Sequence, residues 1–370
     1  MADSDPSKWE MPAHTRAKHE ILTHYLGAWY PILSSWRGRI LYIDGFAGRG
    51  RYNDGSEGSP QIALRRLLEH SFFKRMDCEF VFIFIEKNRR NAENLELELK
   101  TLEGEYDPWP SNVRWQVVNE SFDTQMQELI DAVKAQNRQL APTFAFIDPF
   151  GYTRFPMALL SELARTPNSE LFINFMVGFV QRFIERDGQQ ASMRALYGKD
   201  VAEVLEGFEE GGSRIDHLCD VYADTLREST GLQYIQRFFM LNWTGNVSYA
   251  LIHATSNQTA MSRMKDAMWK VDPGGSYTFS DRTGDSPVLF VPDPDLTPLM
   301  TAILEHFLGR TFVTAEEVRS FAVLETSFRA PHATEVLKQF EREGVITVTR
   351  PKGARQFGSG VTFDFPATPF

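Results

Sequence analysis

The first residues that could do chemistry follow a short apolar run and form the stretch Asp44-Gly45-Phe46-Ala47-Gly48-Arg49-Gly50. Glycines after a buried strand let the backbone adopt positive φ and approach a ligand closely, and the following helix offers its N-terminal amides. An acid at the strand end would repel a phosphate but attract the ammonium group of an amino acid. The pattern therefore predicts a site for S-adenosylmethionine (SAM), although a plain tight turn is the alternative. The predicted contacts are Asp44, Gly45, Phe46, Ala47, Gly48 and Gly50.

Polar residues also follow the next two apolar runs. Glu86 ends the run 78–86, and an acid at the tip of a second parallel strand can accept hydrogen bonds from ribose hydroxyls. It lies 36 residues beyond Gly50 (86 − 50), further than the interval of about 20 typical of NAD sites. Asn119 and Glu120 follow the third run, where they would contact the adenine ring or cap the next helix. A solvated strand-end acid is the alternative for Glu86.

A second reactive corner follows the run FAFI, as Asp148-Pro149-Phe150-Gly151. A carboxylate and the Pro149 carbonyl can accept both hydrogens of an exocyclic amine, and Phe150 can stack on a base. The corner resembles the D-P-P-Y/F motif of amino-methylating nucleic-acid methyltransferases, but it lacks the second proline and its aromatic residue comes one place early. We expect Asp148, Pro149 and Phe150 to position a methyl acceptor, and Asp148 also to contact the cofactor beside its sulfonium. In the alternative, Asp148 caps a helix and Pro149 stiffens the turn.

These corners need a sheet to position them. The apolar runs 39–44, 78–86, 113–118, 143–148 and 171–176 resemble strands buried on both faces, and helical patterns lie at 15–33, 60–70, 88–103, 121–137 and 155–165. This alternation predicts an α/β, Rossmann-like sheet. A polar helical insertion occupies about 185–232. The runs 234–241 and 247–254, joined by a hairpin-like turn, predict two adjacent strands that close the sheet, as in the class I SAM methyltransferase fold.

The predicted domains are a helical lead-in at 1–38, a methyltransferase-like domain at 39–271, a linker at 272–295 and a C-terminal domain at 296–370. Helical patterns at 297–308, 314–325 and 332–343, followed by two short strands, predict a winged helix. Arg350, Lys352 and Arg355 gather at the predicted wing, where they would contact nucleic-acid phosphates or a partner protein.

Composition excludes several classes of protein. The formal charge is −10, from 39 basic and 49 acidic residues, so the chain lacks the footprint of a non-specific nucleic-acid binder. No stretch approaches the roughly 18 uncharged residues of a membrane span, and we expect a cytoplasmic protein that contacts no membrane. Cys78 and Cys219 are too few for a zinc cluster or a disulfide framework. His14, His19 and His24 fan around a helix, so we predict no metal site.

Four stretches together resemble the three-Cys-motif partner (TcmP) family: Lys18 to Leu26, YIDGFAGRGRY at 42–52, Gly58-Ser59-Pro60 with Ala63-Leu64, and FIDPFG at 146–151. The resemblance covers about residues 15–270. That family is regarded as methyltransferase-like and is named for occurring beside a radical-SAM-type protein with three cysteines. The resemblance implies such a partner, and it implies that Lys18 and Ser59 line the cofactor or substrate side. Considered alone, Ser59 would cap a helix that begins at Pro60.

The sequence therefore predicts SAM-dependent methyl transfer to an amine-type acceptor, with a nucleic-acid base as one candidate. The positive charge on the sulfonium makes the remaining thioether a good leaving group, so the reaction mainly needs in-line positioning and no metal. The alternative is a non-catalytic module of the same fold that binds nucleic acid or a protein partner, because fold does not determine chemistry. The glycine order and Asp44 disfavour a dehydrogenase.

Overall fold

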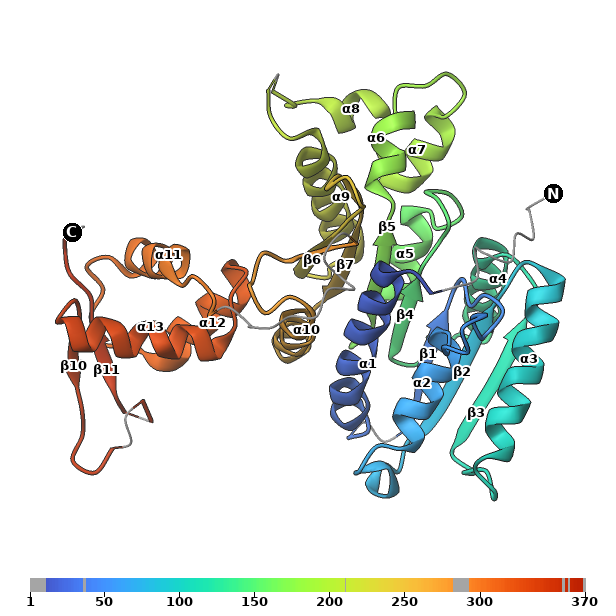
Figure 1. Ribbon diagram of the computed structural model, residues 1–370, viewed down its shortest axis with the longest axis horizontal. Coiled ribbons are helices and arrows are strands. Elements are labelled where there is room, and N and C mark those ends of the chain that lie inside the picture. The colour runs from blue at the N-terminus through green and yellow to red at the C-terminus, as the bar shows by residue number, and fades with distance from the viewer. Residues whose placement is uncertain are drawn as a thin grey trace. The chain divides into compact units, whose positions relative to one another are not determined.

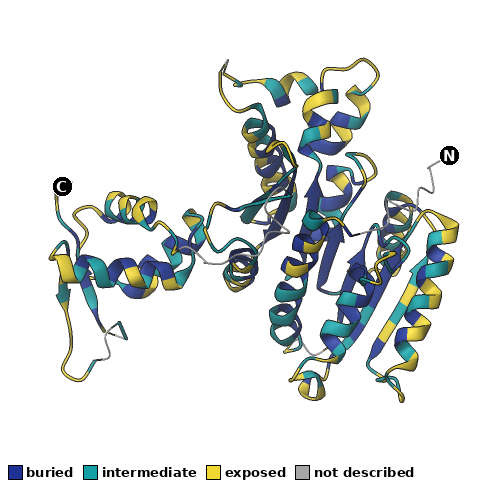
Figure 2. Ribbon diagram, in the orientation of Figure 1, coloured by how far each residue is buried: buried dark blue, intermediate teal, exposed yellow. Residues whose placement is uncertain are grey.

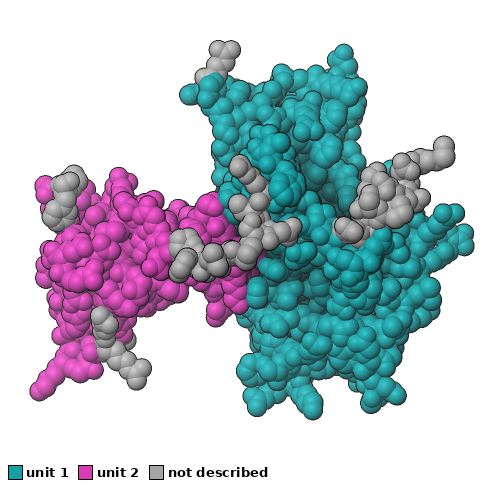
Figure 3. All heavy atoms as spheres, in the orientation of Figure 1, with its two compact units in different colours: residues 1–257, 278–286 teal, residues 258–277, 287–370 magenta. Residues whose placement is uncertain are grey.

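A computed structural model describes residues 11–35, 38–209, 211–281, 293–354, 357–358 and 360–368. The described residues divide into two compact units (Figure 3). Unit 1 lies within 1–257 and 278–286, and unit 2 lies within 258–277 and 287–370. All residues predicted to contact the cofactor or the methyl acceptor belong to unit 1.

Unit 1 is built on an eight-stranded sheet with the order β3-β2-β1-β4-β5-β7-β6-β8 (Figure 1). The first five strands in sequence run parallel, and β7 pairs antiparallel with both β5 and β6. A parallel sheet closed by a late antiparallel hairpin is the arrangement predicted above, so the methyltransferase-like α/β sheet is confirmed. The short β8 at the edge was not predicted. The strands are β1 Arg39–Asp44, β2 Glu79–Ile85, β3 Val113–Val118, β4 Thr143–Ile147, β5 Glu170–Phe175, β6 Tyr234–Leu241, β7 Val247–Thr255 and β8 Thr278–Ser280.

One face of this sheet is covered by α1 (Ala13–Leu33), α2 (Ser59–Leu68) and α3 (Arg89–Gly104). Aromatic rings make the contact, since Phe144 of β4 lies 5.4 Å from Tyr25 and 5.6 Å from Trp29 of α1, centre to centre. At the start of α1, His14 forms a 3.0 Å ion pair with Asp281. The helix is thereby fixed over β1 and β4, with its inner side buried (Figure 2).

The opposite face is covered by α4 (Phe122–Ala135) and α5 (Met157–Ala164). Successive residues of a strand point to opposite faces, so Ala145 and Ile147 face away from the side that Phe144 takes. They share one apolar cluster with Met126 of α4 and Leu160 of α5. Burial on both faces explains why the strands are continuous apolar runs. A short 3₁₀ turn, η2 (Phe73–Arg75), precedes β2.

The helical insertion follows β5 as α6 (Val177–Phe183), α7 (Gln190–Tyr197), α8 (Val201–Leu205) and α9 (Arg214–Thr230). In Figure 1, α6, α7 and α8 gather beyond the carboxyl end of β5, and α9 runs back to pack against α5, β6 and β7. Tyr222 of α9 stacks on Phe175, the last residue of β5, with ring centres 4.2 Å apart. The insertion is therefore packed onto the edge of the sheet at which the predicted site residues lie.

Unit 2 contains α10 (Gln258–Val271), α11 (Thr297–Phe307), α12 (Ala315–Glu325) and α13 (Ala330–Glu343). Its three-stranded sheet has the order β10-β11-β9. The strands are β9 Val313–Thr314, β10 Thr347–Thr349 and β11 Thr362–Asp364. The three helices and two strands predicted after residue 296 are present, whereas α10 and β9 were not predicted. The winged-helix identity and the domain boundaries stay predictions. None of the described helices combines the length and apolar character that crossing a bilayer requires.

Candidate functional site

The glycine-rich turn lies between β1 and α2 and is tied to two neighbouring strands. The Gly45 amide donates to the Phe146 carbonyl and the Ala47 amide to the Ile85 carbonyl, each at 2.9 Å. A Cβ on Gly45 would come within 2.5 Å of the Phe122 ring, so the base of the turn is tightly packed. Gly48 has φ +68°, and a Cβ there would meet nothing within 4 Å. The turn is therefore held rigidly and leaves open space at Gly48.

Asp44 lies inside this turn and is fully buried. The Ser59 hydroxyl donates to Oδ2 at 2.6 Å, and the Phe46 amide donates to Oδ1 at 3.2 Å. Burial raises the pKa of Asp44 to about 7, with a further rise from Asp148, although its two hydrogen bonds and Lys18 oppose the shift. The sequence suggested that this carboxylate meets a ligand ammonium group. In the structure it organises the turn from within.

Ser59 is accordingly not a helix cap. It is the first residue of α2, and Gly58 occupies the N-cap position without a side-chain hydrogen bond. The cap predicted from sequence is displaced by one residue because the Ser59 hydroxyl is engaged by Asp44. Ser59 thus joins the start of α2 to the end of β1.

Glu86 faces the turn from the tip of β2. Its carboxylate accepts hydrogen bonds from the Gly48 amide at 3.0 Å and from the Asn88 amide at 2.6 Å. Burial raises the pKa of Glu86, while these amide hydrogen bonds oppose the rise. Asn119, at the end of β3, donates to the carbonyls of Glu86 and Lys87 at 2.9 and 3.0 Å. The structure therefore brings Glu86, Gly48 and Asn119 to one edge of the sheet.

Glu120 lies beside this group but is turned to the next helix. Its carboxylate accepts a hydrogen bond from the Ser121 amide at 2.7 Å, and Glu120 and Asn119 are both exposed. Contacts of Asn119 and Glu120 with an adenine ring stay predictions.

Asp148 follows β4 at the same edge and is held from two sides. Asn174 of β5 donates from Nδ2 to Oδ1 at 2.6 Å, and Lys18 of α1 forms an ion pair with Oδ2. The side chains of Lys18 and Asp148 are 6% and 21% exposed, so solvent reaches only the carboxylate. The helix-capping alternative is wrong, because α5 begins at Met157 with Pro156 as its N-cap. Pro149 is buried, and Phe150 is fully exposed.

Several buried polar atoms near this ion pair have no hydrogen-bond partner among the described residues: Asn174 Oδ1, Tyr249 Oη and His19 Nδ1. The Lys18 ammonium lies 5.9 Å from the centre of the Tyr249 ring. Burial and Lys18 lower the pKa of His19 to about 3, which keeps the ring neutral. An unpaired buried polar atom costs about 1–3 kcal/mol. Their gathering marks a place that a ligand or ordered water would complete.

Sequence reasoning missed Asn174 and Tyr249, and it considered His19 only as a metal ligand. Asn174 left a signal, as the one polar residue in the apolar stretch LFINF of β5. Tyr249 left none, because a buried tyrosine most often belongs to a core. No group of three or more His, Cys, Asp or Glu that could hold a metal occurs in the described part of the chain.

The residues of the predicted wing belong to unit 2. Arg350 forms a two-bond ion pair with Glu341, at 2.7 and 2.6 Å, which raises the pKa of Arg350 and lowers that of Glu341. Lys352 is exposed in the turn that follows β10, and Arg355 lies outside the described residues. Much of the positive charge of Arg350 is thereby neutralised within the unit.

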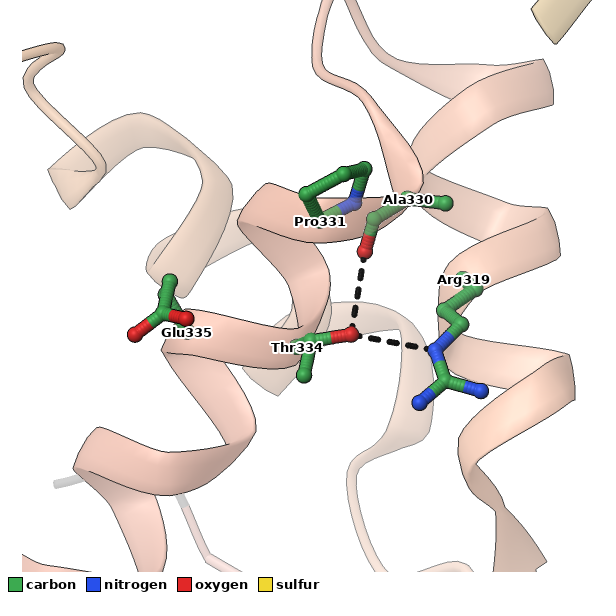
Figure 4. A pocket seen from close by; sticks show the side chains of 5 residues that line it. All are labelled: Arg319, Ala330, Pro331, Thr334 and Glu335. Atoms are coloured by element: carbon green, nitrogen blue, oxygen red, sulfur yellow. Dashed lines mark hydrogen bonds between the residues drawn. The ribbon is translucent and has the colours of Figure 1, made fainter. Parts of the chain in front are cut away.

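Unit 2 also has a surface hollow of about 380 Å³ between α12 and α13 (Figure 4). Arg319 Nε donates to the Thr334 hydroxyl at 3.0 Å, and that hydroxyl donates to the Ala330 carbonyl at 3.2 Å. These polar groups bond to one another within the wall. None of the predicted site residues lines the hollow.

No family model matches this sequence, and no curated protein matches it. Among solved structures, the chain is similar to Trm1 from Pyrococcus horikoshii in complex with S-adenosyl-L-methionine. The identity is 11%, 99% of this chain and 94% of that chain are covered, and the TM-score is 0.37. A putative sarcosine dimethylglycine methyltransferase from Galdieria sulphuraria has 11% identity, coverages of 63% and 84%, and a TM-score of 0.27. Geranyl diphosphate C-methyltransferase from Streptomyces coelicolor A3(2) has 11% identity, coverages of 62% of this chain and 77% of that chain, and a TM-score of 0.24. At these scores the fold assignment rests on the strand order.

Proposed function

We propose that this chain transfers a methyl group from SAM to an amine-type acceptor. One observation carries the proposal. Asp148, held by Lys18 and Asn174, lies at the same sheet edge as the open turn at Gly48 and the carboxylate of Glu86. In parallel α/β sheets this edge is where ligands bind.

The residues of the turn fit SAM. Gly48 leaves room that a side chain would fill, and Glu86 is a carboxylate anchored to the amide of Gly48. Glu86 would accept hydrogen bonds from the ribose hydroxyls. Asp44 and Ser59 would hold the turn in shape without touching the ligand. When bound, SAM supplies an electrophilic methyl group on a sulfonium.

The acceptor side would be formed by the Asp148 corner. The Asp148 carboxylate and the Pro149 carbonyl would accept hydrogen bonds from the acceptor amine. The side chain of Phe150 would stack on the ring that carries this amine. Lys18 and Asn174 fix the carboxylate, so little reorganisation is needed when the acceptor arrives. As the bond from the acceptor nitrogen to the methyl carbon forms, the bond from that carbon to the sulfur of SAM would break, and S-adenosylhomocysteine would leave. The methylated nitrogen would then lose one proton to Asp148 or to solvent.

A non-catalytic module of the same fold is the second candidate. The Lys18 ion pair favours it, because one oxygen of Asp148 is already engaged. The radical-SAM-type three-cysteine protein implied by the family resemblance is proposed as the partner in either case. Nucleic-acid or protein contact through the wing is proposed only for the module.

Calorimetry with SAM and radiolabelled methyl transfer to DNA, RNA and the three-cysteine partner would test the proposal together. We expect micromolar SAM binding and labelling of one acceptor class. Glu86→Gln should weaken SAM binding about tenfold or more, since a hydrogen bond to a charged group contributes about 1.5–3 kcal/mol. The control is Glu228→Gln on α9, which removes an exposed carboxylate paired with Lys199. Absence of SAM binding would refute the proposed methyl transfer, and SAM binding without any labelled acceptor would favour the module.

A further inference from the structure

Aromatic side chains gather beside Asp148 on two segments, the loop that follows β4 and helix α6. Phe150 is fully exposed, and Phe179 of α6 is 40% exposed. The rings of Phe179 and Phe183 are nearly parallel, with centres 6.3 Å apart, and Tyr152 lies 6.1 Å from Phe183. The Tyr152 hydroxyl donates to Gln189 at 2.7 Å, which fixes the loop against the insertion. We call Phe150, Tyr152, Phe179 and Phe183 the aromatic surface.

Positive charge accompanies the aromatic surface. The Arg186 guanidinium lies 5.6 Å from the centre of the Phe183 ring, and Arg182 is exposed on the same helix. Glu185 between them forms an ion pair with Arg214, and the next acid in the sequence is Asp187. Two arginines against one carboxylate give a local surplus of one positive charge, in a chain whose formal charge is −10.

Lys18 restricts the kind of amine that can approach Asp148. A cationic acceptor, such as a lysine side chain, would meet the Lys18 ammonium beside the same carboxylate. Two like charges about 4 Å apart repel by about 4 kcal/mol near a protein surface. A neutral exocyclic amine on a flat ring avoids this repulsion, and Asn174 Oδ1 is an additional acceptor without a described partner.

We propose that the aromatic surface stacks an unpaired base of single-stranded nucleic acid, and that the methyl acceptor is the exocyclic amine of such a base. The second half of the proposal rests on the proposed function, whereas the binding half does not. A paired base is buried in its stack, so only a single-stranded or extruded base can lie on Phe150 and reach Asp148. Aromatic rings interleaved with arginines are the usual platform for single strands, because rings contact bases and arginines contact phosphates.

Fluorescence anisotropy of the full-length chain with labelled single-stranded DNA and RNA, and with duplexes of the same sequences, would test the proposal. We expect tighter binding of single strands. Phe179→Ala should weaken it about 5- to 150-fold, which corresponds to about 1–3 kcal/mol per stacked base. Arg186→Gln should weaken binding and reduce the slope of log affinity against log salt by about 0.7.

The chain offers a matched control at the amino end of the strands. Phe72 is 50% exposed, and the Arg75 guanidinium lies 5.7 Å from the centre of its ring. This pair resembles Phe183 and Arg186. Phe72→Ala and Arg75→Gln should leave oligonucleotide binding unchanged, and thermal melting would verify that all four variants fold.

Equal binding by all variants, or a preference for duplexes, would overturn the proposal. If no oligonucleotide binds and Phe179→Ala instead disrupts a complex with the three-cysteine protein, the aromatic surface is a protein-docking site and the proposal fails. Calorimetry with SAM on the same samples separates this inference from the proposed methyl transfer. SAM binding without single-strand binding refutes this inference alone. Single-strand binding without SAM binding refutes methyl transfer, and with it the acceptor half of this inference, but leaves the binding half standing.

Discussion

Lys18 and Asp148 are separated by 130 positions in the sequence and form an ion pair at the carboxyl edge of the sheet. The pair makes α1 part of the site, because Lys18 reaches the carboxylate only when this helix lies on β1 and β4. Asn174 holds the other oxygen from β5. Three elements, α1, β4 and β5, therefore determine the direction in which the Asp148 carboxylate points.

Removing the ammonium group should destabilise the fold and impair transfer. We expect Lys18→Met to lower the free energy of unfolding by about 1–3 kcal/mol, less than for a fully buried pair because Asp148 is partly exposed. Urea unfolding of Lys18→Met, Asp148→Asn and the double variant gives their coupling energy. A coupling near zero would show that the pair does not stabilise the fold.

Asn174 should act through the orientation of Asp148. Asn174→Asp places a second carboxylate beside Asp148, so we expect methyl transfer to fall about tenfold or more at pH 7. It should recover partly at lower pH, as one of the two carboxylates takes up a proton. The pH profile of transfer checks this, because a merely structural defect would lower the rate equally at every pH.

Asp44 should make stability depend on pH. Burial raises its folded-state pKa to about 7 from the usual 3.8, so the folded protein binds this proton more tightly than the unfolded chain does. The stabilisation is complete below about pH 4 and is lost as the pH rises through 7. The free energy of unfolding of the wild type relative to Asp44→Asn should therefore fall by an amount on the order of 3 kcal/mol between pH 4 and 8.

Urea titrations of both proteins across this range measure that difference. His19, whose pKa is lowered to about 3, has the opposite trend, with stability lost as the pH falls below 6.5. Its contribution cancels in the comparison because both proteins contain it. A difference that does not change with pH would contradict the buried position of Asp44.

Gly48 should matter for the ligand more than for the fold. Gly48→Ala places a side chain at φ +68° in open space beside Glu86, at a cost of about 1–2 kcal/mol to the fold. SAM affinity should fall much further, about 30-fold or more by calorimetry, if the ligand fills that space. The control is Gly55→Ala, which has φ +85° and equally open surroundings in an exposed loop. Equal losses of SAM affinity in both variants would place the ligand elsewhere.

The sequence was sufficient to predict the sheet, because strands buried on both faces leave uninterrupted apolar runs that end in recognisable polar residues. β1 and β3 match their predicted bounds, and Glu86 lies beside the glycine-rich turn as expected. The burial of Asp44 was not predictable, since it depends on the Ser59 hydroxyl at the start of another element. The pairing of Lys18 with Asp148 depends on the docking of α1, which no local pattern specifies. The two residues of β9 are too few to show the alternation of apolar and polar residues that marks a strand.

The position of α1 also bears on the order of events during translation. This helix leaves the ribosome before β4 and β5, yet its aromatic side packs on Phe144, and its lysine needs a carboxylate that Asn174 holds. Until residue 174 has emerged, a nascent chain exposes that apolar side and cannot assemble the corner around Asp148. The corner can therefore first form only after β5 has left the ribosome.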